Sequence, residues 1–202
     1  MKIRFKHQKF QEEACNAICD VFAGQTNETR KFLLDQGEST SNAQSLFGDT
    51  RTGWANPEIH LRNEDLLKNL REIQKEHRIL PNNNLEMLTS KVEWDDGSKQ
   101  IVARPVFTVE METGTGKTYT YIKTMYELNA RYGWSKFIIV VPSIAIREGV
   151  AKTFQMTADH FKEEYGKACR YFIYNSTRLN ELEQFADDPG INVMIINTQA
   201  FN

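Results

Sequence analysis

The chain has 202 residues, 40% of them hydrophobic, and a formal net charge of −2 at pH 7. This length and apolar content suffice for one large or two small domains with a real core. The near-neutral charge excludes a global basic field for nucleic acid, although it is compatible with a local basic groove. No stretch approaches the roughly 18 apolar residues of a membrane span, so we expect no membrane contact.

The cysteine pattern indicates the cellular compartment. The three cysteines, Cys15, Cys19 and Cys169, form neither a paired disulfide framework nor a zinc-ligand pattern. The N-terminal residues lack the long apolar segment of a signal peptide. Free thiols are typical of reducing surroundings, so we expect a soluble cytoplasmic protein.

The first hundred residues alternate between helical and irregular patterns. Apolar residues at helical spacing predict a helix over residues 8–22. From residue 24 to about 57 the composition is polar and contains glycine breakers, which predicts a long, partly disordered loop or inserted excursion. Residues 63–80 are predicted to form an amphipathic helix, and residues 85–103 a hairpin that turns at 95–98.

From Pro105 onward, short apolar runs alternate with helical patterns. Strands are predicted at 105–110, 137–141, 171–174 and 193–196, and helices after Lys117, over 146–165 and over 177–186. Strands that are apolar throughout indicate a parallel sheet covered on both faces. The predicted fold class is therefore α/β, a doubly wound domain of the P-loop type, which binds ligands at the carboxyl ends of its strands.

The most specific motif is a run of six residues between a predicted strand and a predicted helix: Thr113, Gly114, Thr115, Gly116, Lys117 and Thr118. Glycines let successive backbone N–H groups form a concave nest for an anion, and the helix N-terminus adds its own amides. Lys117 is expected to reach the β- and γ-phosphates of a nucleotide, and the Thr118 hydroxyl to bind Mg²⁺.

One position departs from the generic P-loop pattern, which asks for glycine where this chain has Met111. The match is therefore to the helicase-like form TGTGKT. The alternative is an ordinary glycine-threonine turn between a strand and a helix, which leaves Lys117 and Thr118 unexplained.

Four motifs together resemble a known family. The runs VEMETGTGKT (109–118) and VVPSIAIREGV (140–150) look like the ATPase part of the Res subunit of type III restriction enzymes, a superfamily 2 helicase-like DNA translocase. The run VMIINTQAFN (193–202) resembles a third motif of that family, and Phe10-Gln11-x-x-Ala14 resembles the glutamine motif of superfamily 2. The order of the motifs is correct, whereas residues 24–104 contribute little to the resemblance.

The resemblance assigns the cofactors, ATP and Mg²⁺, and gives Lys117 and Thr118 catalytic roles. It also places Gln11 at the adenine base, where a glutamine amide offers the donors and acceptor that complement the N6 and N7 edge. The alternative for Gln11 is a solvated position on an amphipathic helix, and Gln8 is then the second candidate.

The segments that follow two predicted strands are the candidates for nucleic-acid contact. In helicase-like proteins such segments hold the sugar–phosphate backbone without reading sequence. The residues expected to do so are Ser143, Arg147, Thr198 and Gln199. The alternative is that Arg147 pairs locally with Glu148 or Asp159.

Several parts of a superfamily 2 enzyme are not found before Asn202. They are an Asp-Glu-x-His-like motif for hydrolysis, a second motor domain with an arginine finger, and a nuclease domain. The resemblance thus implies an N-terminal piece of a longer enzyme, which binds Mg·ATP weakly without turnover. Its expected units are a helix with the glutamine motif (1–23), an insertion with a helix and a hairpin (24–104), and an incomplete RecA-like, three-layer motor domain (105–202). An open sheet edge predicts self-association.

The implied parent is an ATP-dependent DNA translocase and endonuclease of a type III restriction-modification system. It would act on double-stranded DNA together with a DNA methyltransferase subunit. Two alternatives stay open: another superfamily 2 helicase of repair or remodelling, and a non-motor nucleotide-dependent interaction module or small P-loop kinase. A kinase needs a lid, and no arginine-rich lid segment is visible.

Overall fold

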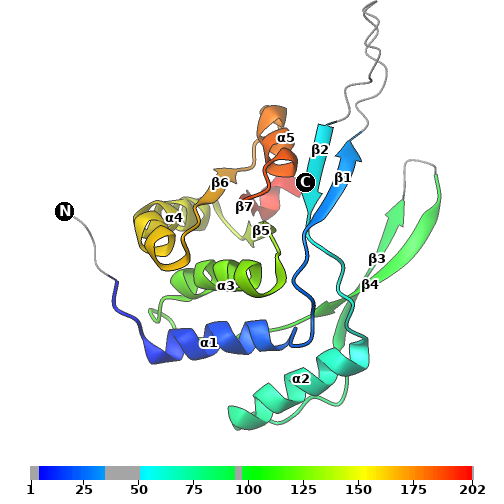
Figure 1. The fold of residues 1–202 in the computed structure, drawn as a ribbon, viewed down its shortest axis with the longest axis vertical. Coiled ribbons are helices and arrows are strands. Elements are labelled where there is room, and N and C mark those ends of the chain that lie inside the picture. The colour runs from blue at the N-terminus through cyan, green and yellow to red at the C-terminus, as the bar shows by residue number, and fades with distance from the viewer. Residues whose placement is uncertain (1–4, 35–50, 94–96, 202) are drawn as a thin grey trace, which may run out of the picture.

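The computed structural model describes residues 5–34, 51–93 and 97–201 (Figure 1). In chain order its elements are α1 (Lys9–Asp20), β1 (Arg30–Leu34), β2 (Arg51–Ala55), α2 (Asn63–Glu76), β3 (Glu86–Glu93), β4 (Lys99–Val106), α3 (Lys117–Tyr132), β5 (Lys136–Val141), α4 (Ile144–Tyr165), β6 (Cys169–Ile173), α5 (Leu179–Asp187), β7 (Ile191–Asn197) and the 3-10 turn η1 (Thr198–Phe201).

A parallel sheet of three strands organises the C-terminal half, in the order β5-β7-β6. The middle strand β7 is buried along almost its whole length. A strand with a neighbour on each side and side chains packed on both faces must be apolar throughout, and the run 191–196 satisfies this condition at most positions. The predicted mixture of helices with a parallel sheet is confirmed.

Aromatic contacts show how helices pack on the sheet at β6. Tyr171 stacks on Phe154 of α4 with ring centroids 4.9 Å apart, and Phe172 meets Phe185 of α5 edge to face at 5.9 Å. Consecutive residues of a strand point to opposite faces. At β6, therefore, α4 contacts one face of the sheet and α5 contacts the other.

The larger hydrophobic cluster joins the helix that follows the glycine loop to the sheet. Its buried members come chiefly from α3, α4 and β7: Tyr119, Ile122, Met125, Tyr126, Val141, Val150, Phe154, Phe161, Ile191, Val193 and Ile195. Packing against this cluster places α3 on the sheet, and with it the glycine loop at the start of the helix.

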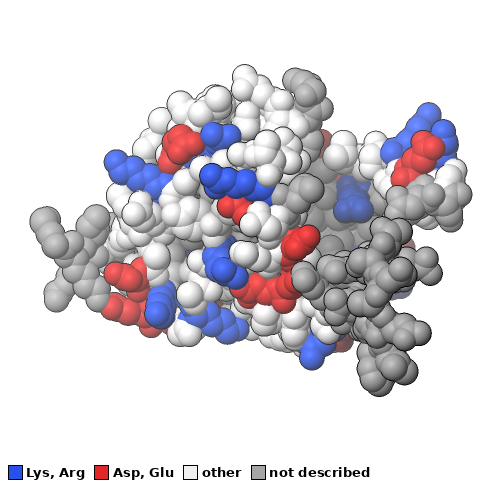
Figure 2. Space-filling model, turned by 90° about the horizontal axis from the view of Figure 1, so that it is seen from above, with Lys and Arg blue, Asp and Glu red and all other residues white. Residues whose placement is uncertain are grey.

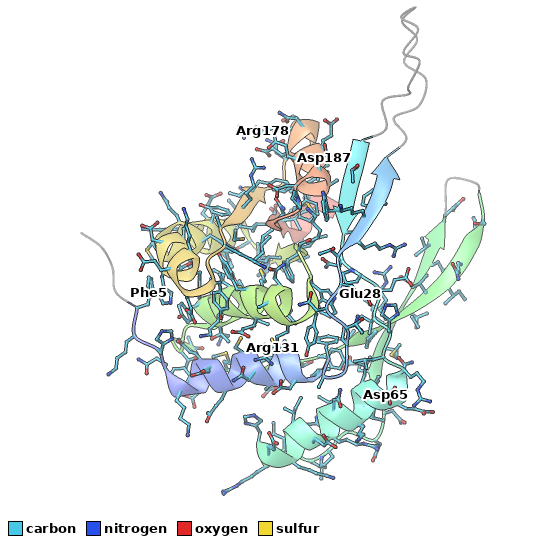
Figure 3. All side chains as sticks on the ribbon, in the orientation of Figure 1. Phe5, Glu28, Asp65, Arg131, Arg178 and Asp187 are labelled. Carbon is cyan, nitrogen blue, oxygen red and sulfur yellow. The ribbon has the colours of Figure 1, made fainter. Side chains whose placement is uncertain are left out.

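The N-terminal helix α1 lies alongside α3 (Figure 1). A second cluster between them contains Cys15, Cys19, Leu128, Tyr132 and Trp134. Polar contacts add to it, since the Tyr132 hydroxyl donates to the Cys19 carbonyl at 2.9 Å. Arg131, which is labelled in Figure 3, donates to Asp20 at 2.8 Å. Both helices are thus fixed relative to each other over several turns.

The strand predicted for residues 105–110 is wrong as a member of the parallel sheet. Pro105 and Val106 instead end β4, which pairs antiparallel with β3 in the register Glu86↔Val106. Residues 107–110 have no strand assignment, and Val109 is exposed. The hairpin partner β3 begins at Glu86, so it does not extend beside residues 107–110 to receive their hydrogen bonds.

The long loop predicted from residue 24 to 57 is also partly wrong, because β1 and β2 form an antiparallel ribbon there. Gly53 stands opposite Phe32, and a Cβ at Gly53 would lie 2.5 Å from the ring. The glycine that looks like a breaker therefore makes room for an aromatic ring across the ribbon. The run 37–42 of the predicted loop lies outside the described residues.

The remaining predictions of the first half hold with shifted ends. The hairpin β3–β4 is confirmed, although residues 95 and 96 of its predicted turn lie outside the described part of the chain. Helix α2 ends at Glu76, four residues before the predicted end. Arg78 has a φ of 57°, a left-handed conformation that an α-helix does not continue through.

Candidate nucleotide and nucleic-acid sites

The glycine loop turns sharply just before α3. Gly114 and Gly116 have φ values of 83° and 85°, in the left-handed region that glycine adopts without strain. The turn is closed on the Glu112 carbonyl, which accepts from the Thr115 amide at 3.4 Å and from the Thr115 hydroxyl at 2.7 Å. The backbone conformation therefore explains why glycine occupies both positions of the loop.

The N-terminus of α3 offers amides to a ligand. Gly116 is its N-cap, and Thr120 is the first residue whose amide bonds back to Gly116, at 3.0 Å. The amides of Lys117, Thr118 and Tyr119 precede that first helical bond, at the positive end of the helix dipole. This arrangement fits a phosphate group, and the half-buried Thr118 stands in the first turn beside it.

Lys117 is folded back onto the loop. Its ammonium donates to the carbonyl oxygens of Met111, at 2.6 Å, and Glu112, at 2.9 Å. Both acceptors are neutral, whereas a phosphate would add the attraction between opposite charges to the hydrogen bond. A nucleotide phosphate is thus a better acceptor for Lys117 than the carbonyls that it contacts.

Gln11 reaches the same loop from α1, 104 residues away in sequence. Its side-chain nitrogen donates to the Thr115 carbonyl at 2.8 Å. A Cβ added to Gly116 would lie 2.5 Å from that nitrogen, so the glutamine also packs directly on the glycine. The structure therefore brings Gln11 together with the P-loop.

The helix α4 begins where β5 ends, with Ser143 as its cap. The Ser143 hydroxyl oxygen accepts from the Ile146 amide at 3.3 Å. Arg147, in the first turn, donates to Glu148 at 3.1 Å, so the local pairing with Glu148 that the sequence left open is present. Its second contact, at 3.4 Å, is the side-chain oxygen of Asn197 at the end of β7.

Asn197 joins two of the predicted segments. This buried residue accepts from Arg147, and its amide nitrogen donates to the Gln199 side chain at 3.3 Å. Arg147 and Gln199 are thus linked through one side chain, whereas Thr198 is exposed on η1. Sequence reasoning missed Asn197, although its place in the NTQ run at the carboxyl end of a strand was the available signal.

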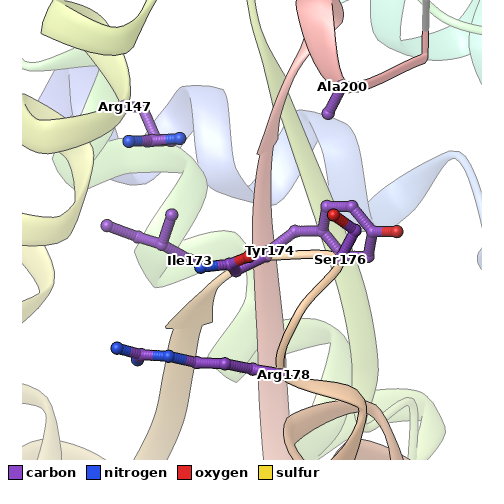
Figure 4. A pocket seen from close by; sticks show the side chains of 7 residues that line it. Arg147, Ile173, Tyr174, Ser176, Arg178 and Ala200 are labelled. Carbon is purple, nitrogen blue, oxygen red and sulfur yellow. The ribbon is translucent and has the colours of Figure 1, made fainter.

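A hollow of about 500 Å³ opens at the carboxyl ends of β6 and β7 (Figure 4). Its lining residues are Arg147, Ile173, Tyr174, Asn175, Ser176, Arg178 and Ala200. Of these, only Arg147 was predicted as a site residue. Arg178 could have been found by the rule that already selected Ser143 and Arg147, since it follows a parallel strand at its carboxyl end.

Charge elsewhere on the surface is mixed. Figure 2 shows Lys and Arg interspersed with Asp and Glu over the face that it presents, as the net charge of −2 suggests. Within residues 5–34, 51–93 and 97–201, no three His, Cys, Asp or Glu side chains gather in a way that could hold a metal ion. Among the same residues, no helix has the length and apolar character that crossing a membrane requires.

A TGTGKT loop at the start of a helix that packs on a parallel sheet is characteristic of P-loop α/β proteins. A family model described as "Type III restriction enzyme, res subunit" matches residues 62–202, more than half of the chain. The chain belongs to this family. The matched range includes α2 and the β3–β4 hairpin, where the sequence motifs gave little resemblance, and it begins after Gln11.

Curated relatives agree with this assignment. The Res subunit of the type III restriction-modification enzyme EcoP15I of Escherichia coli is 32% identical over 126 residues, which is 61% of this chain and 12% of that protein. The EcoPI Res subunit of Escherichia phage P1 is 34% identical over 125 residues, or 61% of this chain and 11% of the relative. The StyLTI Res subunit of Salmonella typhimurium (strain LT2) is 46% identical over 71 residues, which is 35% of this chain and 6% of that protein. The aligned parts thus span about an eighth or less of these relatives.

Proposed function

We propose that the chain is the ATP-binding part of a cytoplasmic, ATP-dependent DNA translocase and endonuclease of a type III restriction-modification system. The observation that carries the proposal is the contact of Gln11 with the P-loop that presents Lys117. We assign residues 105–202 to an incomplete RecA-like, three-layer motor domain. Residues 1–23 then supply the glutamine motif, and residues 24–104 an insertion with a helix and a hairpin.

The residues proposed to hold Mg·ATP are those around the start of α3. The backbone of Thr113, Gly114, Thr115 and Gly116 would surround the phosphates, and the Lys117 ammonium would leave its two carbonyl acceptors for them. The Thr118 hydroxyl would bind Mg²⁺, which offsets the negative charge of the phosphates when it is present. Gln11 would favour adenine over guanine, since its amide carries both a donor and an acceptor.

The nucleic-acid contacts are proposed at the carboxyl end of the sheet. The Ser143 oxygen accepts a helix amide, which leaves its O–H free to donate to a phosphate. Arg147 would donate through its guanidinium, and Thr198 and Gln199 are exposed on the neighbouring turn η1. The proposed partners are double-stranded DNA, held by its backbone, and the methyltransferase subunit of the same system.

Isothermal titration calorimetry tests the nucleotide site. Titration of the chain with Mg·ATP is expected to give heat that Lys117→Ala abolishes, and GTP is expected to give less heat than ATP. Lys152→Ala is the matched control, because it removes the same charge from an exposed position on α4. Equal ATP heats for the parent chain and Lys117→Ala would reject the assignment.

A separate measurement tests the proposal that the chain binds without turnover. Hydrolysis needs a carboxylate at the metal and a group that positions water, and no Asp-Glu-x-His-like run occurs in the 202 residues. Steady phosphate release that Lys117→Ala eliminates would contradict this part of the proposal, while leaving the ATP site intact.

A further inference from the structure

The hollow between α4, α5 and η1 has the composition of an anion site. Arg147 and Arg178 both line it, and no acidic residue does. In the view of Figure 4 the Arg147 guanidinium lies above Ile173 and the Arg178 guanidinium lies below it. Tyr174 and Ser176 add hydroxyl groups to the lining. The hollow therefore offers donors of two kinds, and the carboxylates of Glu148 and Glu181, which pair with the two arginines, are not among its lining residues.

Arg147 has hydrogen-bonding capacity that the described residues do not use. Its Nε atom is buried and has no hydrogen-bond partner among them. A buried donor left unpaired costs roughly 1–3 kcal/mol, and a turn of the guanidinium toward an acceptor in the hollow would remove that cost. The two bonds that the guanidinium does make, to Asn197 and Glu148, hold it at the mouth of the hollow.

Arg178 is the more accessible of the two arginines. Its side chain is 66% exposed, and its ion pair with Glu181 is long, at 3.5 Å. Only its Nη1 atom takes part in this pair, so a phosphate can accept from the other N–H groups of the guanidinium. Arg178 also directly precedes α5, whose first amides add positive character to the same place.

The backbone that carries Arg178 is held in a defined turn. The Asn175 side-chain oxygen accepts from the amide of Thr177 at 3.0 Å and from its hydroxyl at 2.8 Å, and the Arg178 amide donates to the Asn175 carbonyl at 3.0 Å. The Tyr174 amide donates to Ile195 of β7 at 2.9 Å, which ties this segment to the sheet. The hollow is thus a preformed feature of the carboxyl edge.

We propose that Arg178 and Arg147 together bind one backbone phosphate of a DNA strand, with the adjoining sugar in the hollow. A volume of about 500 Å³ lies within the range of pockets that accept a small ligand, and a nucleotide unit is of that size. The inference rests on the proposed function, and it adds the segment 174–178 to the DNA contacts proposed there.

Salt-dependent binding of a labelled oligonucleotide tests the role of Arg178. Arg178→Ala is expected to weaken binding of a single strand and of its duplex about tenfold, and to lower the slope of log Kd against log salt by about one. Arg104→Ala, at an exposed position on β4 outside the hollow, is the matched control and is expected to leave both quantities unchanged. Arg178→Lys is expected to restore the slope and part of the affinity, because the charge returns without the planar fork.

The possible results separate this inference from the proposed function. If Arg147→Ala weakens binding and Arg178→Ala acts like the Arg104→Ala control, the phosphate site at Arg178 is rejected and the proposed function stands. If the parent chain binds neither oligonucleotide, the proposed DNA contact fails and the inference fails with it. The calorimetric ATP test is unaffected by either result.

Discussion

Gly116 shows how a single residue position meets two requirements. It needs a φ of 85°, and its missing Cβ leaves room for the Gln11 side chain. Lysine and glutamine are the residues with visible chemistry, but the glycine determines whether the glutamine can reach the Thr115 carbonyl. The P-loop and α1 therefore depend on each other through this one backbone position.

Gly116→Ala is expected to destabilise the chain. The left-handed conformation costs a non-glycine residue roughly 1–2 kcal/mol, and the new Cβ would lie 2.5 Å from Gln11, which must move. Urea unfolding measures the change. Gly149→Ala is the control, since a Cβ there meets nothing within 4 Å, and alanine inside a helix stabilises by roughly 0.5–1 kcal/mol. If Gly116→Ala stabilised the chain as much as Gly149→Ala, neither the left-handed conformation nor the contact with Gln11 would have an energetic role.

The individual site residues were predictable from sequence to different degrees. The glycines and Lys117 were predictable because their chemistry is local to one short run. Gln11 came from a resemblance, and the structure adds its contact with the loop. Asn197 and Arg178 were missed because their roles depend on which strands are neighbours in the sheet, and sequence spacing does not state that order.

At the scale of elements, α3 and α4 are joined by a polar cluster at the edge of their apolar contact. The Tyr119 hydroxyl and His160 Nε2 are 2.8 Å apart, and Lys123 pairs with Glu164 at 2.9 Å. Phe5, from the segment before α1, covers His160 with ring centroids 5.1 Å apart. The helix that follows the glycine loop and the helix of the proposed DNA contacts thus share a partly buried titratable group.

Stability is expected to depend on the protonation of His160. Burial holds the pKa of His160 below its ordinary value of 6.5, against the opposing effect of Glu164, while His7 and Lys123 add to the lowering. The unfolded chain then binds a proton more readily than the folded chain, so stability is lost as the pH falls below 6.5. Urea unfolding between pH 7.5 and 5.5 should show this loss, and His160→Gln should reduce it. Identical pH profiles for both chains would rule out this role for His160.

The elements themselves were predicted best where the pattern is periodic. The helices and strands after Lys117 follow from their apolar spacing, which marks each element whatever the order β5-β7-β6 of the strands in the sheet. The segment 105–110 has the same apolar character, but only Pro105 and Val106 pair with another strand. That strand is β3, which runs antiparallel to them. Composition indicates a strand without identifying its partner, which explains this error and the missed ribbon β1–β2.

At the scale of the whole molecule, the edge strand β5 exposes apolar side chains. The order β5-β7-β6 leaves β5 without a second neighbour within the described sheet. Ile138 and Val140, two residues apart and so on one face, are 57% and 52% exposed. An apolar edge strand of this kind pairs readily with another chain.

The chain is therefore expected to associate with itself as its concentration rises. Sedimentation equilibrium should give an average mass that increases with concentration for the parent chain and stays near the monomer mass for Val140→Lys. Ile101→Lys is the control, because Ile101 is 66% exposed on the separate β3–β4 hairpin. If Ile101→Lys lowers the average mass and Val140→Lys does not, the association involves the hairpin and not β5.

The side chain of Asn197 bonds Arg147 with its oxygen and Gln199 with its nitrogen. If the Arg147 guanidinium turns toward a ligand, its hydrogen bond to Asn197 must lengthen or break. The Asn197 amide can then reorient, which changes the position of the Gln199 side chain that it contacts. We therefore expect the two residues to act as a coupled pair in the proposed DNA contact, in which the free energy of binding at one includes a contribution from the other. Substitution effects at Arg147 and Gln199 are consequently not additive, as is usual for groups that share a hydrogen-bonding partner.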